Sequence, residues 1–203
     1  MKVLFFIMPI LSIANCMKYM IAYCYHNKRE RVMNIKLRLI ERNDKEEYWK
    51  AGFENPDEEM LHYTATTEKV NFEIIDKFVD KLVDDEERRH FLIIEDGKII
   101  GETSLMDIDF DSRICGFRIA LFNKKYFGMG IGYRAVYETI KYAFEELKLH
   151  RIELEVFDYN KRAKRTYEKV GFKEEGRQRD GLFFKNEYHD VILMSILEGE
   201  FIA

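Results

Sequence analysis

The sequence is poor in residues that interrupt folded domains. Its 203 residues include only two prolines, no serine- or glycine-rich stretch divides them, and no segment repeats at a fixed period. We therefore expect no interior linker. Because 47% of the residues are hydrophobic, the chain has enough apolar surface for one well-packed domain. We expect that single domain to comprise residues 33–203.

Positive charge and cysteine are also scarce. The 33 Lys and Arg residues are outnumbered by 37 Asp and Glu, which gives a formal net charge of -4 and lacks the basic excess that nucleic-acid binding needs. The three cysteines, Cys16, Cys24 and Cys115, form no C-x-x-C pair and cannot build a disulfide framework. We therefore expect no nucleic-acid partner and a reducing, cytoplasmic location.

Residues 1–32 combine an apolar stretch with a basic tail. A signal peptide is disfavoured because Lys18 interrupts the apolar run and no clean cleavage site follows it. A membrane anchor needs about 20 consecutive apolar residues, and Pro9, Asn15 and Lys18 intrude. We favour an upstream extension ahead of Met33, and we expect membrane association only if this segment is a genuine anchor.

The periodic patterns from residue 35 onward predict an α/β domain with a mixed, mostly antiparallel central sheet flanked by helices. A capping-box spacing from Asp44 to Glu47 predicts the first helix, and Asp96-Gly97 predicts a tight hairpin. Gly171 is expected to end the last helix. The predicted strands are 35–39, 90–95, 98–108, 113–121, 152–156, 172–184 and 188–196, and the predicted helices follow Asp44 and cover 72–83, 136–147 and 163–170.

A glycine-rich turn, residues 127–132, lies between a predicted strand and a predicted helix. Free backbone N–H groups and the positive end of a helix can receive phosphate at such a place. The dinucleotide fingerprint G-x-G-x-x-G fails because Tyr133 stands at its last position, and the Gly-Lys-Ser/Thr ending of a P-loop is absent. The turn by itself is either a pyrophosphate cradle of another kind or a purely structural turn.

The stretch from Asn160 to Gly176 reads NKRAKRTYEKVGFKEEG. It resembles the signature N-x-x-A-x-x-x-Y-x-K-x-G-F-x-x-E-G of the GNAT acetyltransferases, and the glycine turn precedes it in the family's order. The resemblance extends from about Ile35 to the C-terminus. It implies the GNAT fold and acetyl-CoA as co-substrate, with no metal required. Within the superfamily the chain resembles the branch of spermidine and ribosomal-protein alanine N-acetyltransferases.

The resemblance also implies residue roles. The main-chain amides of the turn would hold the CoA pyrophosphate, although the family's usual Gln or Arg at the first turn position is Phe127 here. Asn160 would contact the pantetheine arm, and Tyr167 would protonate the departing CoA thiolate. The expected cofactor-binding residues are Ile119, Ala120, Leu121, Phe127, Gly128, Met129, Gly130, Ile131, Gly132, Tyr133, Asn160, Ala163 and Tyr167.

Four basic residues follow Asn160 on the same predicted helix: Lys161, Arg162, Lys164 and Arg165. They either reach the ribose phosphate of CoA or form a solvated helix face.

The acceptor amine must lose a proton, so we expect a carboxylate, or a water held by one, near the acceptor. Many relatives place an acidic residue where Gly116 stands here. Glu102 and Asp107 on the preceding strand are substitutes, and a regular strand points them to opposite faces. Of the two, Asp107 is our choice as the catalytic acid–base residue.

The acceptor is expected to be a primary amine, and a polyamine such as spermidine is our first choice. The acidic residues Glu58, Glu59, Asp107, Asp109 and Asp111 would attract a polycation. A protein N-terminus, as on a ribosomal protein, and an antibiotic amine stay open, as does self-association into a homo-oligomer. An alternative from another class is a non-catalytic acyl-CoA-binding module, which only Gly116 supports. The histidines show no metal-site spacing.

Overall fold

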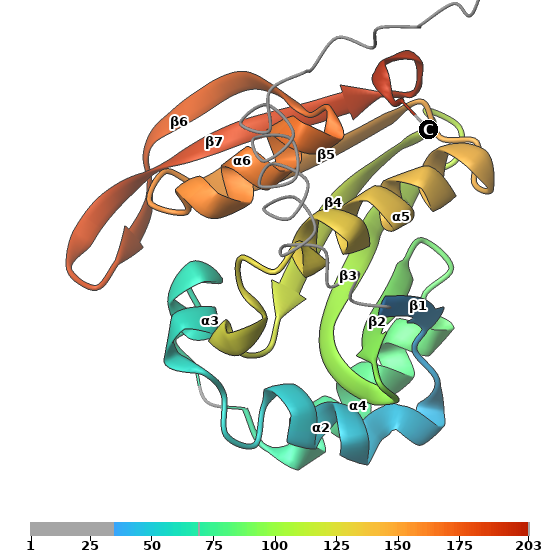
Figure 1. Cartoon of the computed structure of the whole chain (residues 1–203), viewed down its shortest axis with the longest axis vertical. Helices are drawn as coiled ribbons and strands as arrows, with labels where there is room; N and C mark the ends of the chain where they lie inside the picture. Colours follow the sequence, from blue (N-terminus) through green and yellow to red (C-terminus); the bar gives the residue numbers. More distant parts are fainter. Residues whose placement is uncertain (1–34, 69, 203) are drawn as a thin grey trace, which may run out of the picture. The chain divides into compact units, whose positions relative to one another are not determined.

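The structure is a computed structural model that describes residues 35–68 and 70–202. The three interpretations of residues 1–32 lie outside these described residues. The architecture is a seven-stranded sheet in the order β1-β2-β3-β4-β5-β7-β6, as Figure 1 shows. The strands are β1 (Ile35–Leu39), β2 (Arg89–Glu95), β3 (Lys98–Asp109), β4 (Ile114–Leu121), β5 (Arg151–Phe157), β6 (Lys173–Phe184) and β7 (Glu187–Leu197).

The predicted fold class is confirmed. Every neighbouring pair in the sheet is antiparallel except β4 and β5, which run parallel. Helices flank this mixed sheet (Figure 1). They are α2 (Lys45–Gly52), α3 (Glu58–Tyr63), α4 (Phe72–Asp84), α5 (Ile131–Glu145) and α6 (Lys161–Val170), with short 3-10 turns at Arg42–Asp44, Lys124–Tyr126 and Glu198–Glu200.

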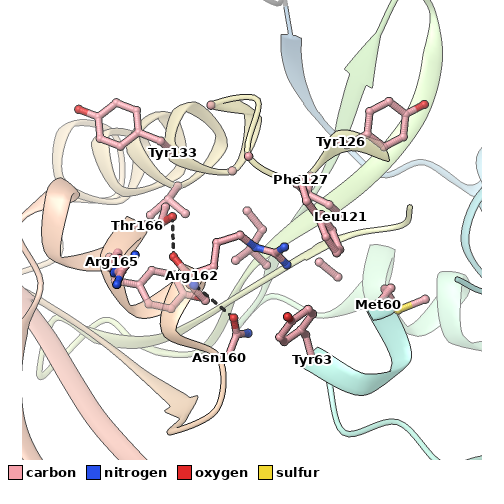
Figure 2. A pocket seen from close by; sticks show the side chains of 18 of the residues that line it. Met60, Tyr63, Leu121, Tyr126, Phe127, Tyr133, Asn160, Arg162, Arg165 and Thr166 are labelled. Atoms are coloured by element: carbon pink, nitrogen blue, oxygen red, sulfur yellow. Dashed lines mark hydrogen bonds between the residues drawn. The ribbon is translucent and has the colours of Figure 1, made fainter. Parts of the chain in front are cut away.

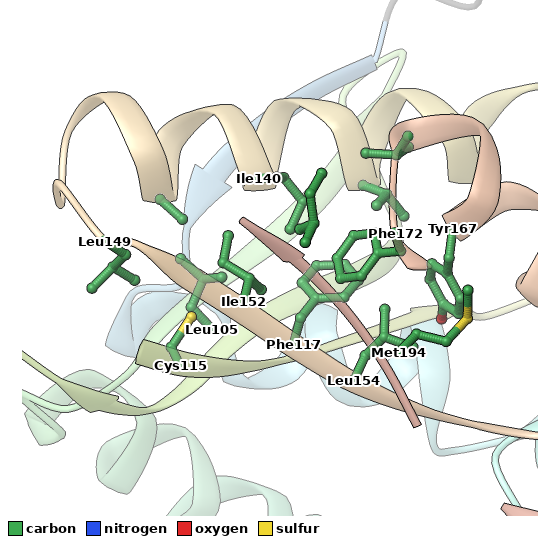
Figure 3. Packing of buried hydrophobic residues seen from close by; sticks show 14 of the residues in the cluster. Leu105, Cys115, Phe117, Ile140, Leu149, Ile152, Leu154, Tyr167, Phe172 and Met194 are labelled. Carbon is green, nitrogen blue, oxygen red and sulfur yellow. The ribbon is translucent and has the colours of Figure 1, made fainter. Parts of the chain in front are cut away.

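Two hydrophobic clusters hold the helices against the sheet. In one, Val136 and Ile140 of α5 and Val170 of α6 pack against inward-facing residues of β3, β4, β5 and β7 (Figure 3). In the other, Val79 and its neighbours on α4 pack with Tyr48 of α2 against β2 and β3. The core therefore uses the apolar faces that the helical and alternating patterns predict.

Local signals placed most element ends correctly. Asp96 and Gly97 have φ of 47° and 77° and form the two-residue turn between β2 and β3. This is the left-handed geometry that Asp-Gly hairpins favour. Gly171, with φ of 116°, ends α6, and its N–H donates to the Tyr167 carbonyl over 3.1 Å. Both predictions are confirmed.

Three local details differ from the predictions. Helix α5 covers 131–145, so it begins and ends earlier than the predicted 136–147. Helix α3 was not predicted, and it begins where the Asp57 side chain accepts the Glu59 N–H over 3.0 Å. The predicted capping box at Asp44 is wrong, because this carboxylate makes two 2.6 Å hydrogen bonds with Arg38 and does not cap α2. Two hydrogen bonds between oppositely charged groups are stronger than those from an uncharged backbone N–H to the same carboxylate.

The feature that positions the functional site is the separation of β4 from β5. These parallel strands pair only from Ile114 to Gly116 on β4 and from Arg151 to Glu153 on β5. Beyond that point β4 continues to pair with β3, as far as Leu121. The facing edges of β4 and β5 are then left free of each other, and the sheet opens between them.

Within the residues that the structure describes, none of the helices has both the length and the apolar character needed to cross a membrane.

Candidate active site

Two cavities meet at the opening between β4 and β5. The first cavity, of about 660 Å³, lies among the end of β4, the glycine turn, α3, α5 and α6 (Figure 2). It is lined by Met60, Tyr63, Thr64, Ile119, Ala120, Leu121, Tyr126, Phe127, Gly128, Gly130, Gly132, Tyr133, Val136, Asn160, Arg162, Ala163, Arg165, Thr166, Tyr167 and Lys169. Eleven of the thirteen expected cofactor-binding residues line it.

The other two expected residues, Met129 and Ile131, belong to the same turn but their side chains do not line the cavity. Met129 is 43% exposed, and Ile131 is buried in the core. Their backbone amides belong to the turn that is expected to bind through its main chain.

The turn itself has the backbone geometry that only glycine adopts at low cost. Gly128 and Gly130 have φ of 73° and 82°, and α5 begins directly afterwards at Ile131. The first N–H groups of α5 lack carbonyl partners within the helix and carry its positive dipole end. A phosphate group fits this arrangement of donors.

Among the described residues that line the first cavity, every charged one is a cation. Arg162, Arg165 and Lys169 contribute positive charge, and no carboxylate lines it. Lys164 is instead held on the outside by Glu168 at 2.9 Å and Glu174 at 3.0 Å. Of the four basic residues singled out in the sequence, the structure therefore brings Arg162 and Arg165 to the cavity.

Arg162 lies across the cavity between two aromatic rings, as Figure 2 shows. Its guanidinium carbon is 3.8 Å from the centre of the Phe127 ring and 4.6 Å from that of Tyr63. These cation–π contacts hold the guanidinium beside the glycine turn. Phe127, which departs from the family's usual Gln or Arg, thus positions a cation that comes from α6.

Asn160 and Tyr167 come from the start and the third turn of α6. The Asn160 side-chain oxygen accepts the Ala163 N–H over 3.1 Å and so begins the helix. Tyr167 packs among Phe117, Phe172 and Met194 at the end of the core cluster nearest the opening (Figure 3). Burial raises the pKa of Tyr167, so the phenol keeps its proton at neutral pH.

The second cavity, of about 680 Å³, lies next to the first along β4 and β5. The two cavities share five wall residues: Tyr63, Thr64, Ile119, Asn160 and Tyr167. The rest of its lining is Met106, Gly116, Phe117, Arg118, Arg151, Glu153, Leu154, Glu155, Val156, Phe157, Glu175, Gln178, Leu193 and Met194. A group bound in one cavity can therefore meet a group bound in the other beside Tyr167.

The second cavity has the opposite charge balance. Three carboxylates, Glu153, Glu155 and Glu175, line it with two guanidinium groups, Arg118 and Arg151, which leaves one net negative charge. Arg151 donates to both oxygens of Glu175, over 2.8 and 2.5 Å. These hydrogen bonds lower the pKa of Glu175 to about 2.

The predicted acid–base residue is not brought to either cavity. A bulge of β3 between Met106 and Asp109 leaves Asp107 exposed with φ of 51°. The other candidate, Glu102, is hydrogen-bonded by the Tyr48 hydroxyl and lies 3.3 Å from His90 Nε2. Burial raises the pKa of Glu102, but the nearby His90 ring and the hydrogen bond from Tyr48 outweigh it, and the net pKa is lowered.

Sequence reasoning missed the cavity-lining residues of β5. From α3 it singled out the acidic residues Glu58 and Glu59, which line neither cavity, and it did not predict the helix. Tyr63 of α3 lines both cavities. The sequence feature that could have predicted this helix is Asp57, which caps it, because six residues are too few to show a helical periodicity. Glu153 and Glu155 alternate with buried residues on β5, a pattern equally typical of a solvated strand face. Only the partial pairing with β4 places them at a cavity.

The comparisons with known proteins agree with this geometry. Residues 34–173 match the family described as Acetyltransferase (GNAT) domain. The Escherichia coli (strain K12) protein named spermidine N(1)-acetyltransferase is 28% identical over 170 residues, which are 84% of this chain and 89% of that protein. The crystal structure of spermidine N-acetyltransferase from Vibrio cholerae in complex with CoA and spermine superposes with a TM-score of 0.73 at 28% identity, covering 82% of this chain and 96% of that one.

A third relative shows greater identity over a shorter match. The Bacillus subtilis (strain 168) protein named "Putative ribosomal N-acetyltransferase YdaF" is 36% identical over 110 residues, which are 53% of this chain and 58% of that protein. The glycine turn at the start of α5, the cations of the first cavity and the phenol at the junction with the second cavity are compatible with CoA as a ligand. Together with the family match over residues 34–173, they lead to the conclusion that this chain belongs to the GNAT family and is an acetyl-CoA-dependent N-acetyltransferase.

Proposed function

We propose that the acceptor is a primary amine, with a polyamine such as spermidine as the preferred substrate. The observation that carries this proposal is the pair of cavities joined at Tyr167. The charged residues that line one are all cationic, and those that line the other are net negative. CoA carries its phosphates as anions, and a polyamine is a chain of cations. Complementary potentials favour each ligand in a different cavity. The similarity to spermidine N-acetyltransferases over most of the chain supports the same acceptor class.

The cofactor side of the proposal follows the geometry of the first cavity. The amides of the glycine turn and the start of α5 bind the pyrophosphate, and Arg162 and Arg165 add positive charge. The free edge of β4 at Ile119–Leu121 offers backbone groups to the pantetheine arm, because β5 does not pair with it there. The thioester then lies where the two cavities meet.

Tyr167 supplies the proton for the leaving group. As the amine nitrogen bonds to the acetyl carbon, the C–S bond breaks and a thiolate forms. The buried phenol donates its proton to that sulfur, and Asn160 holds the adjoining part of the cofactor from the same helix. Burial keeps Tyr167 protonated until that moment.

A protein N-terminus is the second candidate acceptor. The match to the protein named "Putative ribosomal N-acetyltransferase YdaF", at 36% identity, favours it. An extended N-terminal peptide would bring one ammonium group to Tyr167, whereas a polyamine would also place a further cation against the net negative lining of the second cavity.

The test compares these acceptors directly. The kcat/KM of the wild-type protein is measured with spermidine, with monoamines and with short peptides that carry free N-termini. We expect spermidine to exceed a monoamine of similar length by about tenfold or more, since one favourable ionic contact is worth about 1–2 kcal/mol in a partly buried site. A preference for peptides over every polyamine would overturn the polyamine assignment in favour of the second candidate.

A further inference from the structure

The acceptor amine needs a group that takes its proton. A primary amine resembles the lysine side chain, whose pKa is about 10.4, so it arrives protonated at neutral pH. A protonated nitrogen cannot attack a thioester, and a carboxylate within reach of the acceptor is the usual solution. Asp107 and Glu102 do not line the second cavity, which leaves Glu153, Glu155 and Glu175.

Glu175 is occupied by other partners. Besides the two hydrogen bonds from Arg151, it accepts one from the Ser195 hydroxyl over 2.7 Å. These contacts lower the pKa of Glu175 to about 2, which makes it a weak proton acceptor. The role of Glu175 is structural, because it fixes the Arg151 guanidinium at the edge of the cavity.

Glu153 stands at the point where the sheet opens. Its partner in the parallel register is Gly116, and this pair is the last one before β4 and β5 separate. Neighbouring residues in register point to the same face of a sheet, so the side-chain position that Gly116 leaves empty lies beside the Glu153 carboxylate. A Cβ on Gly116 would have only Met106 atoms near it, at 3.6 and 3.8 Å, which leaves room there for a substrate nitrogen or a water.

The Glu153 carboxylate is held on one side only. Its Oε2 accepts hydrogen bonds from Arg151 Nε and Nη2 over 3.3 and 3.2 Å. No residue in the described part of the chain donates a hydrogen bond to its Oε1. Arg151 thus orients the Glu153 carboxylate, whose second oxygen is available to a ligand.

Tyr167 lines the same cavity as Gly116 and Glu153. Its ring packs 6.3 Å from that of Phe117, on the face of the sheet opposite to Gly116, because successive side chains of a strand alternate. The cavity thus reaches the phenol through the opening between the strands. Glu155 is two residues farther along β5, about 6–7 Å beyond Glu153. Continuing the register past the last pair would set Glu155 opposite Arg118, a cation that lines the same cavity. Glu153 is therefore the carboxylate at the open position beside Gly116, in the cavity that Tyr167 also lines.

We propose that Glu153 accepts the proton of the acceptor ammonium, at the position where Gly116 offers no side chain. The proton passes to the carboxylate directly or through one water, and the neutral nitrogen attacks the acetyl carbonyl. The C–N bond forms, the C–S bond breaks, and Tyr167 gives its proton to the CoA sulfur. The carboxylic acid and the phenolate then exchange with solvent, so both groups return to their starting states. This assignment rests on the proposed function.

The test uses Glu153→Gln and a matched variant, Glu155→Gln, each with two acceptors. One acceptor is fully protonated at the assay pH, and the other has a low pKa and is largely neutral. For Glu153→Gln we expect kcat with the protonated amine to fall by about 10²–10³-fold, and with the neutral amine by less than tenfold. For Glu155→Gln we expect a higher KM for the acceptor, with kcat within about threefold. Because Arg151 keeps its contacts with Glu175, thermal unfolding should shift little and serves as the folding control.

Two results would overturn the assignment while leaving the proposed function intact. One is a Glu153→Gln kcat within threefold of wild type, and the other is an equal loss with both acceptors, which indicates a role in binding or packing only. A wild-type protein that turns over no primary amine would overturn the proposed function and this assignment together.

Discussion

Replacement of Tyr167 by phenylalanine separates the chemistry of the phenol from the packing of its ring. The side chain is only 7% exposed and its ring packs against Phe117, Phe172 and Met194. Phenylalanine fills nearly the same volume, and isosteric changes in a core cost less than about 1.5 kcal/mol. For a domain of this size that cost corresponds to a shift in Tm of at most roughly 3–6 °C.

The effect on the rate should be far larger. A positioned general acid contributes about 10²–10⁴-fold, which equals about 3–5 kcal/mol of transition-state stabilisation. We therefore expect kcat of Tyr167→Phe to fall by at least about a hundredfold at saturating acetyl-CoA and amine. Burial raises the pKa of Tyr167, so the wild-type phenol keeps its proton above the ordinary tyrosine value of about 10. The wild-type pH profile should accordingly show no alkaline loss of activity from this group up to that pH.

The assay is the release of CoA thiol, with thermal unfolding measured on the same samples. Tyr167→Ala is the control, since it also removes the ring and should cost about 3–5 kcal/mol of stability. A Tyr167→Phe variant with kcat within threefold of wild type across the pH range would refute the proton-donor role. A large loss of Tm in that variant would show that the hydroxyl has a structural task.

Three further predictions concern the cofactor side and the core. Gly130→Ala should lower stability by about 1–2 kcal/mol in thermal unfolding and raise the KM for acetyl-CoA, because residue 130 has φ of 82°; unchanged values would contradict the strained turn. Arg162→Gln should raise the KM for acetyl-CoA by about tenfold at low salt and by less at high salt, whereas Lys161→Gln, outside the cavity lining, should not; equal effects would exclude a specific role for Arg162. Burial raises the pKa of the Cys115 thiol to about 12. Cys115 should therefore resist a thiol reagent at pH 8 until the protein unfolds. Rapid labelling of Cys115 in the native protein, located by mass spectrometry, would contradict this prediction.

The parts of the fold that local signals determine were predictable from the sequence. Asp96, Gly97 and Gly171 all have positive φ. As expected, the first two form the turn between β2 and β3, and Gly171 ends α6. The alternation of Ile152, Leu154 and Val156 with charged residues correctly marked β5. The Asp44 capping box failed because Arg38, on the neighbouring strand, offered a stronger partner than the helix amides. Such competition between a local and a tertiary contact is not visible in one sequence.

The candidate site was predictable on one side only. A linear motif is enough to predict the cofactor side. The glycine turn directly precedes α5, Asn160 begins α6, and Tyr167 lies within α6. The acceptor side depends on where β4 and β5 stop pairing, which is a property of the whole sheet. Asp107 was chosen over Glu102 by resemblance to the polyamine enzymes, and the bulge of β3 leaves it outside both cavities. Glu153, which we propose as the proton acceptor, was not singled out because its strand pattern is also typical of a solvated face.

The most direct measurement of the central claim is transfer of a labelled acetyl group from acetyl-CoA to spermidine, followed by mass spectrometry of the amine and by the release of CoA. The two-cavity geometry predicts acetylspermidine formed in equal amount to free CoA, with both products lost in Tyr167→Phe. Binding of acetyl-CoA without an acetylated amine, or CoA release that leaves spermidine unmodified, would contradict it.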